Sequence, residues 1–129
     1  MVLDHFDAVW RAALAASGDH RVAEDVTTAV LRAAAADATQ EELVRRAVLA
    51  AVRQAPAPAF ARMGGAEREA VALARIAGCP IGEVAAALGI ADGAARRLLT
   101  AGLRSMLPRR PASVPRRLPP VLGCGIAVS

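Results

Sequence analysis

The pattern of apolar and polar positions predicts three helices in the first half of the chain. The first has an apolar stripe at helical spacing, formed by Phe6, Val9, Trp10, Ala13 and Leu14. After a Gly-Asp interruption, a second amphipathic stretch covers residues 21–36. Thr39 is followed three residues later by Glu42, which is the spacing of a capping box, so a third helix is expected from there to Gln54.

The second half begins with a break in this pattern. Residues 55–65 read APAPAFARMGG and are expected to form a linker, because alternating prolines and a glycine pair do not continue a helix. Three further helices are predicted over residues 66–77, 81–88 and 92–106. Gly78 and Gly89 follow the first two of them, where glycine readily takes a left-handed backbone conformation.

Residues 107–129 differ from the rest in composition. Five of the eight prolines lie between Pro108 and Pro120, around two Pro-Arg-Arg triplets. This tail is expected to be largely disordered. The chain is therefore divided into helical residues 1–54, a linker over 55–65, helical residues 66–106 and the tail.

Composition favours a helical fold. The 129 residues include 33 alanines but only two Phe, one Trp and no Tyr. Alanine has the highest helix propensity, and β-sandwiches and barrels are rich in aromatic and β-branched residues. We therefore predict an all-α protein.

The sequence offers little for catalysis or metal binding. Cys79 and Cys124 are too few and too far apart for a disulfide framework or a zinc site. His5 and His20 have no cysteine or acidic partner at metal-ligand spacing, so we expect no enzyme activity, metal or cofactor. The chain has no stretch of about 20 uncharged apolar residues, and aspartates stand where a signal peptide is basic. A cytoplasmic protein without a membrane partner is expected.

Charge is distributed unevenly along the chain. Residues 1–60 hold six Arg against eight Asp and Glu, a net charge of −2, whereas residues 61–129 hold ten Arg against four acids, a net charge of +6. A basic half joined to an acidic half indicates that the basic half meets a polyanion. An ordinary solvated surface rich in arginine is the other interpretation of the same charges.

Residues 82–104 carry the most informative pattern. A short helix, a turn at Gly89 and a second helix with arginines near its start have the layout of a helix-turn-helix. Ala85 is small where the helices would cross, and the expected core between them is Val84, Leu88, Ile90, Ala95 and Leu99. The start of the second helix would face the DNA major groove. The alternative is a plain helical hairpin with solvated arginines.

This segment resembles region 4 of the extracytoplasmic-function sigma factors, through Glu83-Val84-Ala85-Ala86-Ala87-Leu88-Gly89-Ile90 and Ala94-Ala95-Arg96-Arg97-Leu98-Leu99. Upstream, Ser17-Gly18-Asp19 and Ala23-Glu24-Asp25-Val26-Thr27 are similar to a signature of region 2 of that family, in the family's order. The resemblance covers about residues 6–54 and 66–106. It implies a bacterial protein in which a region 2-like three-helix unit precedes a region 4-like helix-turn-helix.

The resemblance also implies roles for individual residues. Region 2 of the family binds core RNA polymerase, which places Glu24, Asp25 and Thr28 on a polymerase-facing helix. It also opens the minus-10 element, which places Arg45, Arg46 and Arg53 on a helix that approaches promoter DNA. Region 4 reads the minus-35 element of double-stranded promoter DNA, which implicates Asp92, Gly93, Ala94, Arg96, Arg97 and Arg104. An anti-sigma factor is a further candidate partner. A simpler role for Glu24 and Asp25 is to favour the helix dipole from a first turn.

The chain departs from the family in ways that weaken the expected activity. Residues 31–36 read LRAAAA where the family carries aromatic rings, and stacking on a ring is worth about 1–3 kcal/mol per base. Ala91 replaces the usual serine cap, a loss of about 1 kcal/mol unless Asp92 takes over. A linker as short as residues 55–65 reaches at most about 36–40 Å, against roughly 50 Å between the two promoter sites. We therefore expect weaker promoter melting and affinity.

Two other functions stay open. A stand-alone helix-turn-helix regulator would use its N-terminal helices for dimerisation or ligand binding, and it predicts a dimer on a palindromic site. An interaction protein that has lost DNA binding would sequester another factor. It predicts DNA binding that is absent or independent of salt, because phosphate contacts release counterions.

Overall fold

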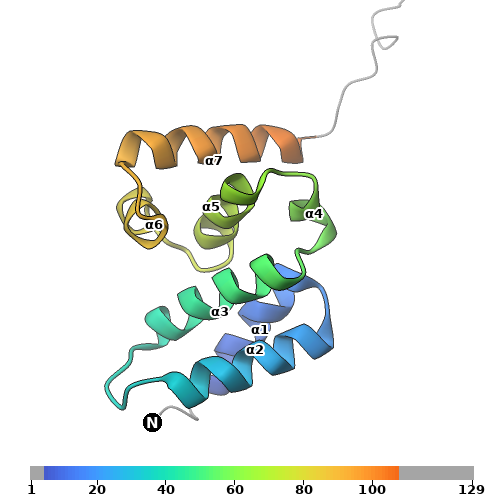
Figure 1. Ribbon diagram of the computed structural model, residues 1–129, viewed down its shortest axis with the longest axis vertical. Helices are drawn as coiled ribbons and strands as arrows, with labels where there is room; N and C mark the ends of the chain where they lie inside the picture. The colour runs from blue at the N-terminus through green and yellow to red at the C-terminus, as the bar shows by residue number, and fades with distance from the viewer. Residues whose placement is uncertain (1–4, 108–129) are drawn as a thin grey trace, which may run out of the picture.

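A computed structural model describes residues 5–107, which form seven helices and no strand (Figure 1). The helices are α1 (Phe6–Ser17), α2 (His20–Ala33), α3 (Gln40–Gln54), α4 (Pro58–Ala61), α5 (Gly65–Arg75), α6 (Ile81–Leu88) and α7 (Asp92–Met106). The predicted all-α class is confirmed for this part of the chain. The tail predicted to be disordered lies outside the described residues, apart from Leu107 at the end of α7.

Local capping explains where α2 and α3 begin. The Asp19 carboxylate accepts hydrogen bonds from the backbone N–H groups of Arg21 and Val22, at 2.9 and 3.2 Å. Thr39 and Glu42 form the predicted capping box. The Thr39 hydroxyl accepts from the Glu42 N–H at 3.2 Å, and the Glu42 carboxylate accepts from the Thr39 N–H at 3.0 Å.

The second helix is shorter than predicted. It ends at Ala33 instead of residue 36, since Ala34 has an extended backbone with ψ at 139° and its N–H bonds to the carbonyl of Leu31. The alanines that follow have no long side chain to pack against α1 or α3. Most helical stability in proteins comes from such packing, so the helix propensity of alanine does not by itself extend α2.

Alanine and valine dominate the core between α1, α2 and α3, whose buried members include Val9, Ala13, Ala23, Val26, Leu43, Ala47 and Val48. Small side chains let the helices pack closely. Phe6, which was expected on the buried stripe, is 44 % exposed in the first turn of α1. Trp10 is half-buried, with its ring 5.7 Å from the ring of His20.

The last three helices share a second core, made of Ala70, Leu73, Cys79, Val84, Ala85 and Ala95. Of the predicted core residues, Leu88, Ile90 and Leu99 are partly buried against it. Gly78 and Gly89 have the predicted left-handed backbone, with φ at 69° and 68°. Helices α5 and α7 are in close contact at Gly102, where a Cβ atom would overlap the Val71 side chain.

Residues 55–65 do not form the expected open linker. Pro58 is at the start of the short helix α4, a position that proline accepts because the N–H it lacks has no partner there. Ala57, Phe60 and Met63 are buried in the same core as α1–α3, and the Ala57 N–H donates to the carbonyl of Ala16 at 2.9 Å. Burying these apolar side chains lowers the free energy of the folded chain, whereas an extended linker would leave them exposed to water.

The two halves pack on one another. Val71 and Ala72 of α5 belong to the core that α1–α3 build, and α3 lies against α5. In Figure 1, α7 lies at one end of the molecule, α5 and α6 come next, and α3 separates them from α1 and α2 at the other end. The predicted boundaries near residues 54 and 65 coincide with helix ends. The division into a region 2-like and a region 4-like domain stays a prediction.

Candidate nucleic-acid interface

Helices α6 and α7 meet at a tight turn. Gly89 ends α6 in a left-handed conformation, and its N–H bonds back to the carbonyl oxygens of Ala85 and Ala86. The backbone of Ala91 is extended and its side chain makes no capping hydrogen bond, as its apolar methyl group requires. Asp92 lies in the first turn of α7, where a carboxylate favours the helix dipole.

The start of α7 is presented to solvent. Asp92, Gly93, Arg96 and Arg97 are exposed, Ala94 is half-buried, and Ala95 is fully buried against α5 and α6. The site where a Cβ of Gly93 would lie is 3.7 Å from Nη1 of Arg97, so the guanidinium of Arg97 extends back over the first turn. Ala95 anchors the helix while its neighbours in sequence project outward.

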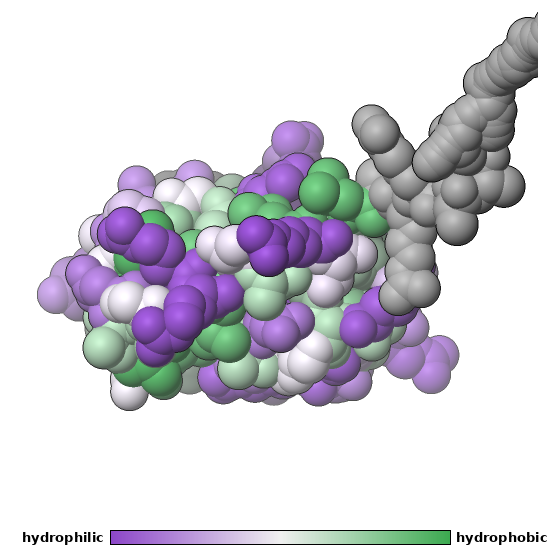
Figure 2. Space-filling view, turned by 90° about the horizontal axis from the view of Figure 1, so that it is seen from above, coloured by the Kyte–Doolittle hydropathy of each residue, from purple (hydrophilic) through white to green (hydrophobic). Residues whose placement is uncertain are grey.

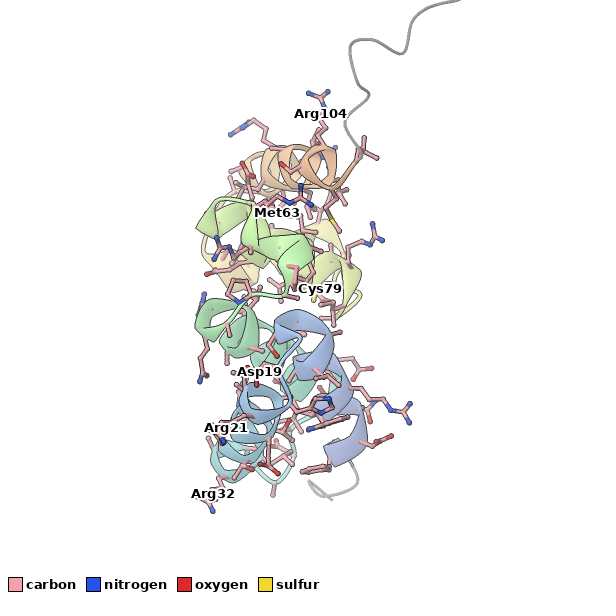
Figure 3. All side chains as sticks on the ribbon, turned by 90° about the vertical axis from the view of Figure 1, so that its right-hand side faces the viewer. Asp19, Arg21, Arg32, Met63, Cys79 and Arg104 are labelled. Carbon is pink, nitrogen blue, oxygen red and sulfur yellow. The ribbon has the colours of Figure 1, made fainter. Side chains whose placement is uncertain are left out.

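Two shallow, adjoining hollows run along the outer face of α7. The first is lined by Gly93, Arg96, Arg97, Thr100, Ala101 and Arg104. The second is lined by Arg75, Thr100, Leu103, Arg104, Met106 and Leu107. Figure 2 looks onto this face and shows hydrophilic side chains crossing it, with hydrophobic ones gathered beside them. In Figure 3, Arg104 projects from the end of the molecule away from its body.

The arginines of this face make no internal ion pair within residues 5–107. The ion pairs in that range join Arg11 to Asp7, Arg45 to Glu83 and Arg53 to Glu69. No carboxylate lines either hollow. Arg75 also lines this face, although the sequence did not single it out as a binding residue. Its one signal was a basic side chain in the last turn of the helix that precedes the predicted helix-turn-helix.

The arginines predicted on α3 have a different environment. Arg53 donates from Nε and Nη2 to the two carboxylate oxygens of Glu69 on α5, at 2.9 and 3.0 Å. These hydrogen bonds raise the pKa of Arg53. Arg45 donates to Glu83 of α6 at 3.4 Å, whereas Arg46 is exposed. The structure therefore does not bring the α3 arginines together with those of α7, and two of the three contact the second half of the chain.

The residues predicted to bind polymerase lie on α2. Glu24 and Asp25 are exposed and Thr28 is half-buried. The simpler dipole role for the two acids is wrong, because α2 has no acidic residue in its first turn and Asp19 caps it instead. Arg21 and Arg32 of the same helix appear in Figure 3 at the end opposite Arg104.

The single cysteine among the described residues is a packed group. Cys79 lies between α5 and α6 and is 8 % exposed, as expected for a small buried thiol. Burial raises the pKa of its thiol. No cluster of three or more His, Cys, Asp or Glu side chains within residues 5–107 is arranged to hold a metal ion. None of the helices in this range is both long and apolar enough to cross a membrane.

Comparison of the chain with protein-family models, with curated proteins and with solved structures gave no match.

Proposed function

We propose that this protein binds double-stranded DNA through α6 and α7 and acts, as a short sigma-like factor, in transcription initiation with RNA polymerase. The observation that carries the proposal is the outward face of α7. Arg96 and Arg97 are exposed at the start of the helix and have no internal carboxylate partner among residues 5–107. A guanidinium in that position can contact guanine edges or phosphates in a major groove.

Burial of Ala95 and the turn at Gly89 support the same proposal. They hold α7 at a defined angle on α5 and α6, so its first turns enter a groove as a rigid unit. The two-domain organisation of the sigma family, with a region 2-like unit in residues 1–54 and a region 4-like unit in residues 66–106, belongs to this proposal. So do a cytoplasmic location and an anti-sigma factor as a further partner.

Polymerase binding is assigned in this proposal to the exposed face of α2. Glu24 and Asp25 are available there to basic residues of a protein partner, and neither forms an ion pair within residues 5–107. Because α2 and α7 lie at opposite ends of the molecule, polymerase and DNA can be bound at the same time (Figure 1).

A second function is favoured by the α3 arginines. Arg45 and Arg53 contact Glu83 and Glu69, so the helix that would approach the minus-10 element is engaged by the protein itself. This arrangement favours a DNA-binding regulator that uses α6 and α7 alone.

Co-sedimentation with core polymerase and run-off transcription separate the two functions. The sigma-like function predicts binding of the wild-type chain, loss of binding in Asp25→Arg, and normal binding in the control Asp37→Arg, which changes an exposed acid in the turn after α2. Promoter-dependent transcripts would follow. DNA binding without any polymerase binding would establish the regulator and refute the sigma-like function.

A further inference from the structure

The basic face of α7 extends beyond Arg96 and Arg97, which are proposed to contact the bases, to Arg104 in the last turn of the helix. Gly93, Arg97, Thr100 and Arg104 recur at spacings of four, three and four residues, which places them in one line along the helix. Arg97 and Arg104 are two turns apart, about 10 Å along the axis. Thr100 and Arg104 line both hollows, so the hollows adjoin along the helix and together make up the α7 trough.

The far end of this trough is built from two helices. Arg75, in the last turn of α5, lines it together with Arg104 of α7. Gly102 of α7 lies against Val71 of α5, and this packed contact fixes the two helices that carry Arg75 and Arg104 relative to one another. Arg75 is exposed and, like Arg104, makes no ion pair within residues 5–107.

The chemistry of the trough fits a polyanion with regularly spaced charges. Two guanidiniums that have no ion pair among residues 5–107 line a hollow to which this part of the chain contributes no carboxylate. One strand of duplex DNA offers a phosphate about every 3.4 Å along the axis. The Thr100 hydroxyl donates its hydrogen bond to the carbonyl of Arg96 at 2.9 Å, so the donors that remain for a ligand in the trough are the arginines. The chain also continues past α7 with Arg109, Arg110, Arg116 and Arg117 and no acidic residue.

We propose that Arg75 and Arg104 form a phosphate-binding clamp that holds the DNA backbone beside the bases reached by Arg96 and Arg97. This inference rests on the proposed DNA-binding function and adds to it a contact from α5 that does not depend on base sequence. Phosphate contacts fix the register and orientation of a protein on the duplex, whereas base contacts specify the site. Arg75 therefore contributes to affinity on every sequence equally.

The test is the salt dependence of binding by the full chain. Association with a 30-base-pair duplex of mixed sequence is measured by fluorescence anisotropy between 50 and 200 mM NaCl. The same titration is run on a duplex that the wild-type chain selects from a random library. The variants are Arg75→Gln and the control Arg32→Gln, which removes the same charge from an exposed position on α2 at the other end of the molecule.

Each phosphate contact contributes about 0.9 to the slope of log K against log salt. Arg75→Gln is therefore expected to make this negative slope shallower by about 0.9 on both duplexes. It should weaken both complexes equally and leave the ratio of their affinities unchanged. Arg32→Gln should keep the wild-type slope. Circular dichroism establishes that both variants are folded.

Other results would overturn the clamp. Equal slopes for Arg75→Gln and Arg32→Gln would show that Arg75 makes no phosphate contact. A loss of affinity in a further variant, Arg96→Gln, would in that case leave the proposed function intact. A changed affinity ratio in Arg75→Gln would make it a base-reading residue instead. If Arg75→Gln binds DNA normally but no longer binds a poly-glutamate peptide that the wild-type chain binds, the trough would be assigned to an acidic protein partner. Absence of DNA binding by the wild-type chain would overturn both the clamp and the proposed function.

Discussion

Arg53 and Glu69 form a two-pronged ion pair that joins α3 to α5. Nε of Arg53 lies 2.9 Å from Oε2 of Glu69, and Nη2 lies 3.0 Å from Oε1. The Glu69 side chain is 20 % exposed and the Arg53 side chain 55 %, so the pair lies at the edge of the contact between the two halves. A residue that the sigma resemblance places near DNA thus holds the protein's own halves together.

Reversing one charge of this pair should destabilise the contact between the halves. Arg53→Glu places two carboxylates together, and Arg53→Gln removes the attraction at a cost of about 1 kcal/mol or less, since the pair is partly solvated. The double variant Arg53→Glu with Glu69→Arg should recover most of the stability lost by Arg53→Glu. Urea unfolding of the wild-type chain, Arg53→Glu, Glu69→Arg and the double variant measures the coupling between the two residues. Strict additivity of the two single changes would show that the pair contributes nothing.

Gly102 should not tolerate alanine, although alanine is the better helix former. Replacing an interior helical glycine normally gains about 0.5–1 kcal/mol. Here the new methyl group would overlap the side chain of Val71 across the α5–α7 contact, and overpacking of that kind costs about 1–3 kcal/mol. Thermal unfolding should show a lower midpoint for Gly102→Ala.

Gly93→Ala is the matched control for this prediction. It changes the same residue type in the same helix, but its methyl group would meet only the flexible end of Arg97, at 3.7 Å. Its unfolding midpoint should rise. A higher midpoint for both variants would mean that α5 and α7 are not in close contact at Gly102.

The capping box of α3 predicts a pH dependence in the acid range. Hydrogen bonds from the backbone and hydroxyl of Thr39 lower the pKa of Glu42 from its ordinary value of 4.5. Because the folded pKa lies below the unfolded one, this contribution to stability is complete above about pH 4.5 and disappears as the pH falls through the folded pKa. Stability measured from pH 6 to pH 3 should fall more steeply for the wild-type chain than for Glu42→Gln. Parallel curves would contradict the capping box.

Cys79 should react slowly with thiol reagents while the protein is folded. Its thiol is buried between α5 and α6, and burial raises its pKa, so little thiolate is present at pH 8. In a Cys124→Ser background, reaction with a disulfide reagent should be slow in buffer and fast in urea. Rapid reaction in buffer would show that α5 and α6 open readily.

Local signals in the sequence predicted much of the fold, whereas tertiary contacts decided the rest. The Thr39 capping box and the turn at Gly89 are specified within a few residues, and both were predicted correctly. Phe60 packs into the core of α1–α3, whose other members are far away in the chain. The nearby prolines therefore indicated only that the helix ends, not that the segment is buried. The Arg53–Glu69 pair spans 16 residues across two helices, and no periodicity reveals it. Arg75 joins the α7 trough for the same reason.

The proposed function requires the outward arginines of α7 to bind duplex DNA. The most direct test is the dissociation constant of the full chain for a 30-base-pair duplex at 100 mM NaCl. The double variant Arg96→Gln with Arg97→Gln is compared with Arg21→Gln with Arg32→Gln, which removes two exposed arginines from α2. A good arginine–base contact is worth about 1–3 kcal/mol. DNA binding through α7 predicts at least a tenfold loss of affinity for the α7 variant and little change for the α2 variant. Equal affinities of the two variants would contradict DNA binding by Arg96 and Arg97.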